Sequence, residues 1–348
     1  MEDIIPEIPR ELLLSELNKD RYVRKTNNGE NEIYIITHKD SPHTMKEIGR
    51  LREVSFRHAG GGTGNSIDID EFDLGEHPYK QLLVWNPVEQ EIVGAYRYIL
   101  CKDAEYVDGK VLLATTELFD FSPEFYRDYL PYTIELGRSF IQPQYQPSEH
   151  FRKGLFSLDN LWDGLGAIVV DNPDMKYYYG KVTMYTDFNV EARDYILAFL
   201  KYYFPDPKKL VTPIHGIEIK TDVSSFLKEI EGKDYKAGHA VLNKHVREMG
   251  ENIPPMVNAY SNLSSTMMSF GTAINPTFGG VEETGILVTI ADIYKSKSDR
   301  HIETYIKELR DRKDLKATEG IYAVRKIFII VCQQRFNQRR TTPYGIFR

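Results

Sequence analysis

The sequence lacks the features that mark secreted, membrane-spanning and disulfide-rich proteins. Its 348 residues include only two cysteines, Cys101 and Cys332, and both lie in apolar runs. Two thiols cannot build a disulfide framework or a cysteine metal site, so we expect buried, reduced thiols. No apolar run approaches the ~20 residues of a membrane span, and the acidic N-terminus has no apolar stretch of signal-peptide length. We therefore expect a cytoplasmic protein.

Motifs of nucleotide binding, serine catalysis and metal binding are missing as well. No G-x-G-x-x-G stretch joins a strand to a helix, and no G-x-x-x-x-G-K-[ST] loop is present, which argues against dinucleotide and P-loop chemistry. No serine lies in a G-x-S-x-G elbow, and the histidines lack the spacing of zinc ligands. The acidic run at 68–73 lacks the closing glutamate of a calcium loop. We therefore predict no metal site.

Charge is distributed unevenly along the chain. The whole sequence has a net charge of −7 at pH 7. From Lys295 onward there are 14 Lys/Arg and 6 Asp/Glu, so this end is basic and the rest of the chain carries a net charge of −15. An acidic body argues against nucleic acid as a partner, and the basic end needs a separate explanation.

Apolar periodicity predicts a mixed α/β fold. Strands are predicted at 32–38, at 79–101 as a hairpin turning at Asn86-Pro87, and at 132–141, 177–185 and 284–293. Helices are predicted at 41–59, 156–172 and 189–204, with one helix inside 205–255 and a short one inside 253–280. Because hairpins come early and crossovers late, we expect a central, mostly antiparallel sheet flanked by helices. We divide the chain into an N-terminal extension (1–30), a main domain (31–293, with a helical excursion at 205–255) and a helical, basic C-terminal extension (294–348).

Arg97 is a charge on an otherwise apolar strand face. An unpaired buried charge costs several kcal/mol, roughly, so this arginine needs a carboxylate or a bound anion. Asp70 and Asp73 follow a glycine-rich loop, and Arg52 lies on the helix predicted before that loop. Two interpretations of Arg97 stay open, an ion pair that holds the sheet to a helix or a site that orients a substrate. The aspartates either belong to a solvated loop or form a cluster that meets Arg52 and Arg97.

The stretch "TIELGRSF", 133–140, has a glutamate and an arginine three residues apart. Side chains on a regular strand alternate between faces, so Glu135 and Arg138 would point in opposite directions. A β-bulge shifts the register by one residue, and Gly137 is suited to one. If both charges serve one site, the strand must be irregular. We therefore predict a bulge or a splayed strand at Leu136–Gly137.

The order of these features resembles the N-acyltransferase branch of the GNAT superfamily. The resemblance is carried by "RLREVSF", "DIDEFD", "LLVWNPVEQEIVGAYRYIL", "ELGRSFIQPQY" and "IPPMVNAYSNLSSTMMSFGTAINPTFGGVEETGILVTI", in that order. The resemblance covers about residues 32–293. Within this branch, the sequence is similar to the ornithine-lipid and glycine-lipid N-acyltransferases, sometimes called hemolysin-like. The acyl-homoserine-lactone synthases share the pattern more distantly. The resemblance implies a GNAT-like fold with a twisted sheet and splayed strands.

The resemblance also implies a charged network at the active site. The matching positions are Arg52, Asp70, Asp73, Arg97, Glu135 and Arg138. Glu135 is the candidate base, and Arg97 or Arg138 is the candidate ligand for the acceptor's carboxylate. A backbone N–H near Gly137 would stabilise an oxyanion. For the acyl donor we predict contacts at Gly137, Ser139, Phe140, Lys153 and Gly154, with Lys153 and a helix N-terminus holding a phosphate.

The family reaction moves a fatty acyl group, typically 3-hydroxyacyl, from acyl carrier protein to the amino group of an amino acid, with glycine or ornithine favoured here. The product is the lyso form of a bacterial aminolipid. The amine attacks the thioester directly, so the resemblance implies neither a covalent enzyme intermediate nor a tightly bound cofactor. Peripheral contact with the inner face of the membrane would suit such a product.

Three questions stay open at this stage. The stretch "PSEHFRKGLFSL", 147–158, departs from the Q/R-x-x-G-x-G/A turn that holds coenzyme A pyrophosphate, which favours a carrier-protein donor over acyl-CoA. A short-chain acyl-CoA-dependent N-acetyltransferase and a non-enzymatic membrane-associated protein are the alternative functions. The apolar, arginine-rich tail is interpreted as a core helix with a solvated end, an interfacial membrane anchor or a dock for an acidic carrier protein.

Overall fold

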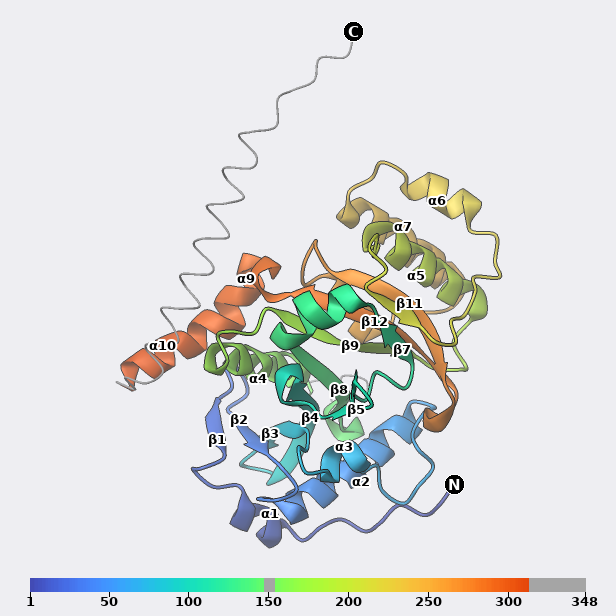
Figure 1. Ribbon diagram of the computed structural model, residues 1–348. Helices are drawn as coiled ribbons and strands as arrows, with labels where there is room; N and C mark the ends of the chain where they lie inside the picture. The colour runs from blue at the N-terminus through green and yellow to red at the C-terminus, as the bar shows by residue number, and fades with distance from the viewer. Residues whose placement is uncertain (147–153, 313–348) are drawn as a thin grey trace.

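The computed structural model describes residues 1–146 and 154–312 and has one large sheet with helices on both faces (Figure 1). The strand order in this sheet is β1-β2-β3-β4-β8-β9-β12-β11. The strands are β1 (Tyr22–Lys25), β2 (Glu32–Ile36), β3 (Lys80–Asn86), β4 (Glu91–Leu100), β8 (Thr133–Ile141), β9 (Tyr177–Met184), β11 (Met268–Asn275) and β12 (Val281–Thr289). Neighbouring strands are antiparallel except β8 and β9, which are parallel. The predicted mixed α/β fold with a mostly antiparallel sheet is confirmed.

The remaining elements surround this sheet. Two small sheets pair β7 (Phe119–Phe121) with β10 (Val211–Pro213) and β5 (Tyr106–Val107) with β6 (Lys110–Val111). The helices are α1 (Arg10–Glu16), α2 (Pro42–His58), α3 (Glu71–Leu74), α4 (Ser157–Asp171), α5 (Val190–Tyr203), α6 (Ser224–Ile230), α7 (Tyr235–Glu248), α8 (Pro255–Ser261), α9 (Lys295–Ser298) and α10 (Thr304–Asp311), with π-turns η2 (Phe125–Tyr129) and η7 (Asp299–Glu303). None of the described helices is long and apolar enough to cross a membrane. Most of the basic tail, from residue 313, and Lys153 lie outside the described residues.

Two strands of the main sheet escaped the periodicity analysis. β1 has only four residues, and it forms an edge of the sheet within the range assigned to the N-terminal extension. β11 pairs with β12 through a register shift between Ser269 and Thr272, and Gly271 there has a φ of 89°. The irregularity breaks the alternation on which strand prediction depends. The chain division at residue 31 stays a prediction.

Buried side chains pack on both faces of the sheet in three clusters. Helices α4, α5, α8 and α10 cover one face, where Leu161 and Ile196 pack with sheet residues such as Leu82 and Val288. On the opposite face, α1 and α2 pack over the β2–β4 region in one cluster. A second cluster on that face gathers around Phe125, between η2 and the β9–β12 region. The alternation of side chains along each strand separates these two faces.

The parallel pair β8–β9 separates halfway along its length. The two strands pair from Thr133↔Tyr177 to Leu136↔Gly180, and no pairing follows although both strands continue. Each strand keeps its other neighbour, β4 or β12. A gap therefore opens within the sheet directly after Leu136, the position at which a splayed strand was predicted.

A β-bulge in β8 lies next to this gap at Arg138–Ser139, two residues beyond the predicted Leu136–Gly137. Against β4, Gly137 pairs with Arg97 and Phe140 pairs with Ala95, so Arg138 and Ser139 together oppose Tyr96. Arg138 has a φ of 46°, the left-handed conformation that favours glycine. The bulge brings the Arg138 side chain to the same face as Glu135.

A glycine in α4 determines how closely η7 approaches that helix. An ideal Cβ at Gly166 would lie 2.3 Å from the backbone oxygen of His301. We expect Gly166→Ala to lower the free energy of unfolding by about 2 kcal/mol, because backbone must move to make room. Urea unfolding followed by circular dichroism measures this change. Gly216→Ala is the control, since its Cβ would make only ordinary contacts, the nearest with the Pro213 side chain, 3.4 Å away. Equal effects of the two variants would contradict the prediction.

Candidate active site

A cavity of about 430 Å³ lies at the gap between β8 and β9. Its walls include side chains from both faces of the sheet. The face toward α2 and α3 contributes mainly polar groups and rings, Phe56, Tyr79, Arg97, Thr115, Glu135, Arg138, Lys181, Phe278 and Glu283. The face toward α4 and α8 contributes mainly apolar groups, Tyr96, Leu136, Tyr178, Val182, Met256, Tyr260, Ile286 and Val288. The cavity therefore passes through the sheet and has a polar end and an apolar end.

Glu135 is the carboxylate at the polar end, and only 1% of the residue is exposed. Its Oε1 accepts a hydrogen bond from the backbone N–H of Thr115 at 2.9 Å, and its Oε2 accepts one from the hydroxyl of Tyr79. The Tyr79 hydroxyl in turn accepts from the N–H of Ala114 at 3.0 Å. Burial raises the pKa of Glu135 above its usual value, while the bonds from Thr115 and Tyr79 act in the opposite direction. A carboxylate in this environment is suited to accept a proton.

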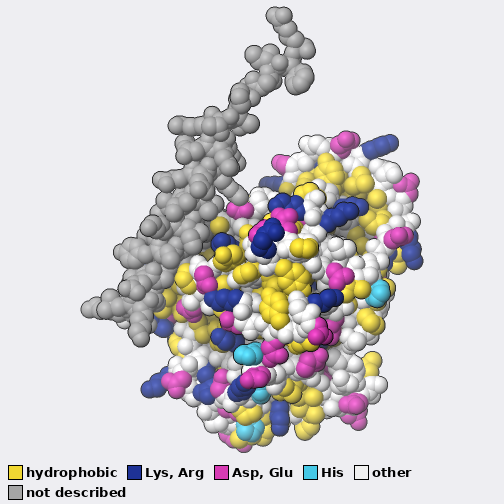
Figure 2. All heavy atoms as spheres, in the orientation of Figure 1, with side chains coloured by type: hydrophobic (Ala, Val, Ile, Leu, Met, Phe, Trp, Pro, Cys, Tyr) yellow, Lys and Arg dark blue, Asp and Glu magenta, His cyan; other side chains and the backbone are white. Residues whose placement is uncertain are grey.

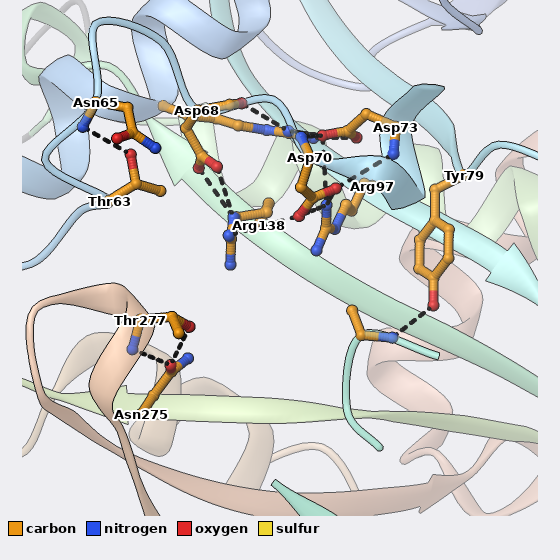
Figure 3. Close-up of polar contacts among 12 residues, drawn as sticks. Thr63, Asn65, Asp68, Asp70, Asp73, Tyr79, Arg97, Arg138, Asn275 and Thr277 are labelled. Atoms are coloured by element: carbon orange, nitrogen blue, oxygen red, sulfur yellow. Dashed lines mark hydrogen bonds and ion pairs between the residues drawn. The ribbon is translucent and has the colours of Figure 1, made fainter. Parts of the chain in front are cut away.

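Three arginines and three aspartates form a chain of ion pairs beside Glu135 (Figure 3). The pairs are Arg52–Asp73 at 2.8 Å, Asp73–Arg97 at 3.3 Å, Arg97–Asp70 at 2.7 Å, Asp70–Arg138 at 3.7 Å and Arg138–Asp68 at 2.9 Å. Gln81 also binds both Arg52 and Asp73. Although burial favours the neutral acid, the charges of Arg52 and Arg97 hold the pKa of Asp73 well below its usual range. Asp73 and the two arginines that contact it therefore stay charged.

The geometry separates two groups among the residues predicted to be catalytic. Glu135, Arg97 and Arg138 line the cavity. The other three, Arg52, Asp70 and Asp73, do not line it and instead hold the two cavity arginines in place. Among the described residues, Glu135 forms no ion pair with an arginine, although the charge of Arg97 acts to lower its pKa. The Arg97 guanidinium lies 5.3 Å from the ring of Tyr79, which donates to Glu135. The catalytic roles of all six stay predictions.

The residues predicted for donor binding are also divided. Gly137 and Ser139 line the cavity. Phe140 packs in the core against Phe56, with ring centroids 6.4 Å apart, and does not line the cavity. Gly154 lies against Tyr145, whose backbone oxygen would be 2.3 Å from a Cβ there. Lys153 lies outside the described residues.

Several polar groups in the cavity were missed by the sequence analysis. Lys181 binds Glu283 at 2.6 Å, and Asn275 donates to the same carboxylate at 2.9 Å. A charge inside an apolar strand had already indicated Arg97, and the same signal is present at Lys181. Tyr79 and Thr115 had no comparable signal, because they meet Glu135 only through the fold.

A sheet that separates at one parallel pair, with a cavity crossing the gap, defines the fold of a GNAT-type acyltransferase. The family model described as "Acetyltransferase (GNAT) domain" matches residues 51–153. The chain is 51% identical over 325 residues to a "Glycine N(alpha)-acyltransferase" of Phocaeicola vulgatus, which covers 93% of this chain and 99% of that protein. It is also 51% identical over 328 residues to a protein of the same name from Bacteroides thetaiotaomicron, covering 92% and 96%. The chain belongs to this family of amide-forming N-acyltransferases, so the non-enzymatic alternative is not retained.

Two solved structures of lactone synthases are weakly similar. The AHL synthase LasI has a TM-score of 0.31 and 15% identity, covering 45% of this chain and 74% of that chain. The CoA-dependent acyl-homoserine lactone synthase BjaI, solved with SAM and isopentyl-CoA, has a TM-score of 0.34 and 12% identity, covering 78% and 88%. Likeness at this level carries no argument about the site.

The buried ion-pair chain leads to a prediction about stability. Asp73→Asn removes a charge that faces both Arg52 and Arg97, so the buried Arg52 guanidinium loses its carboxylate partner and Arg97 keeps only Asp70. We expect the free energy of unfolding to fall by about 3 kcal/mol. Urea unfolding measures the loss. Asp128→Asn is the control, because its ion pair with Arg127 is exposed and should contribute nothing measurable. A stable Asp73→Asn variant would show that the network does not depend on this charge.

The Tyr79–Glu135 bond leads to a prediction about pH dependence. Since that bond lowers the pKa of Glu135, Tyr79→Phe should raise this pKa. If Glu135 must be ionised to act as the base, activity is lost as pH falls through its pKa. We expect the acidic limb of kcat/KM to move to higher pH by about one unit. Tyr34→Phe, which removes a phenol bound to Glu32, should leave the profile unchanged. A lower rate with an unmoved acidic limb would argue against Glu135 as the base.

Proposed function

We propose that the protein transfers a 3-hydroxy fatty acyl group from acyl carrier protein to the amino group of glycine, giving an N-acylglycine, the lyso form of an aminolipid. One observation carries this proposal. The cavity joins a buried carboxylate and two arginines on one face of the sheet to an apolar wall on the other face. A small zwitterion and a long acyl chain could then enter from opposite ends and react at the gap.

The polar end is suited to an amino acid. Arg97 and Arg138 are each held by aspartates on one side while they line the cavity. Either guanidinium can bind a carboxylate through a bidentate pair of hydrogen bonds. The two relatives are named for glycine, and on that basis we favour glycine over ornithine as the acceptor.

The chemistry requires one proton to move and one bond to be exchanged. The neutral amine nitrogen of glycine attacks the thioester carbon, and a C–N bond forms as the C–S bond breaks. Glu135 accepts the proton that the nitrogen loses, directly or through water, and the proton then passes to the thiolate that leaves. A backbone N–H at Gly137 or Arg138, where β8 no longer pairs with β9, stabilises the oxyanion.

The donor is proposed to be a carrier protein because the residues before α4 depart from the turn that binds coenzyme A pyrophosphate. Helix α4 begins at Ser157 and has no side-chain cap at its N-terminus. The Ser157 N–H donates to the Gly154 backbone oxygen, and the next N–H groups of the first turn could bind the single phosphate of phosphopantetheine. Gly154 keeps the chain just before α4 close to Tyr145, which supports a phosphate site at this helix N-terminus.

The test is an assay of the purified full-length protein with defined donors and acceptors. Glycine and 3-hydroxyacyl carrier protein should yield N-acylglycine, detected by mass spectrometry, and ornithine should yield less product. Glu135→Gln should lower kcat at least about 100-fold, whereas the exposed-site control Glu248→Gln should not. Faster turnover of acetyl-CoA would favour the short-chain N-acetyltransferase. No product from glycine with any donor would overturn the proposal.

A further inference from the structure

The apolar end of the cavity contains three hydroxyl groups. Tyr96 lies on β4, Tyr260 lies on α8, and Ser139 is the second residue of the bulge. All three line the cavity. The phenol oxygens of Tyr96 and Tyr260 are 3.4 Å apart, and the Ser139 side chain is a hydrogen-bonding neighbour of Tyr96. A polar cluster is therefore built into a wall that is otherwise apolar.

The two phenols have hydrogen-bonding capacity left over. Buried O–H groups normally bond at 2.7–2.8 Å, roughly, so a contact of 3.4 Å is loose. Each phenol can both donate and accept, yet among the described residues the Tyr260 hydroxyl forms a hydrogen bond only with Tyr96. In contrast, Tyr178 in the same wall donates to the backbone oxygen of Leu165 at 2.7 Å. Tyr96 and Tyr260 are only 2% and 6% exposed, so bulk water cannot easily complete their bonds.

The packing of Tyr260 fixes the position of its hydroxyl. Its ring stacks edge to face on Trp162 of α4, with centroids 5.4 Å apart. Burial raises the pKa of Tyr96 and of Tyr260, so both phenols keep their protons and can donate. The cluster is thus a preformed donor and acceptor site.

The cluster lies close to the place where the thioester is proposed to react. Ser139 follows Gly137 by two residues on β8, with only the bulge residue Arg138 between them. An acyl chain that runs from the polar end to the apolar end must pass the cluster within its first few carbons. A hydroxyl group on carbon 3 lies in that part of the chain.

We propose that Tyr96, Tyr260 and Ser139 bind the 3-hydroxyl group of the acyl donor and so determine its selection over an unsubstituted acyl donor of the same length. The inference rests on the proposed function for the identity of the donor and assigns the residues that recognise it. A hydroxyl placed between the two phenols completes their hydrogen bonds. A methylene at that position leaves the loose contact between the two phenols as it is and gives Tyr260 no second partner, which costs binding energy.

The experiment compares kcat/KM for 3-hydroxyacyl and unsubstituted acyl carrier proteins of equal chain length, using the full-length protein. We expect wild type to prefer the hydroxylated donor about tenfold, the size of one neutral hydrogen bond. Tyr260→Phe and Tyr96→Phe should bring the ratio close to one, mainly by slowing the hydroxylated donor. Tyr98→Phe is the matched control, because Tyr98 is the next buried tyrosine on the same face of β4 and does not line the cavity. Its ratio should equal that of wild type.

Binding is measured in parallel with acyl-pantetheine analogues in which an amide replaces the thioester, with and without the 3-hydroxyl. Wild type should bind the hydroxylated analogue about tenfold more tightly, and the two phenol variants should lose this difference. Equal affinity of wild type for the two analogues, or an undiminished preference in both variants, would overturn the inference. Absence of turnover with retained binding preference would contradict the proposed function and leave the hydroxyl site standing. Thermal unfolding of each variant confirms that it is folded.

Discussion

The separation of β8 from β9 is the constraint on which the site depends. Gly180 makes the last paired position close-packed, since a Cβ there would lie 2.8 Å from the backbone oxygen of Leu136. Beyond that pair each strand remains bonded to its outer neighbour, so backbone hydrogen bonds are lost only at the gap. The sheet therefore keeps its strand pairing on both sides of the gap. Residues from its two faces, which a continuous sheet would keep apart, share one cavity.

Charged side chains on the surface and charged side chains in the interior are arranged differently. Figure 2 shows charged side chains of both signs interspersed on the visible surface, with an apolar area between them. The buried charges near α2 and α3 differ from these surface charges, because each of them is paired with a specific partner (Figure 3). Arg52 is fully buried and binds Gln81, the Asp68 backbone oxygen and Asp73, which in turn holds Arg97. Such a chain fixes the direction of a guanidinium more strictly than a single ion pair does.

Long elements with regular apolar spacing could be predicted from the sequence, and short or irregular ones could not. Helix α2 and the β3–β4 hairpin appear within a few residues of their predicted bounds. β11 was missed because a bulge interrupts its alternation. Within the site, charges on apolar strands were visible as anomalies, and Arg97 is the clearest case. The partners of Glu135 could not be predicted, because Tyr79 and Thr115 are ordinary residues until the fold places them beside a carboxylate.

Arg138 occupies a backbone conformation that an L-residue with a side chain adopts only at a steric cost of about 1–2 kcal/mol. Glycine would relieve that strain, but it would also remove the only guanidinium that pairs with the Asp68 carboxylate in the described chain. Stability and chemistry therefore compete at a single position. Selection for heat resistance alone would favour losing this arginine, and a thermostable variant with glycine at 138 would have exchanged part of its polar wall for a relaxed backbone.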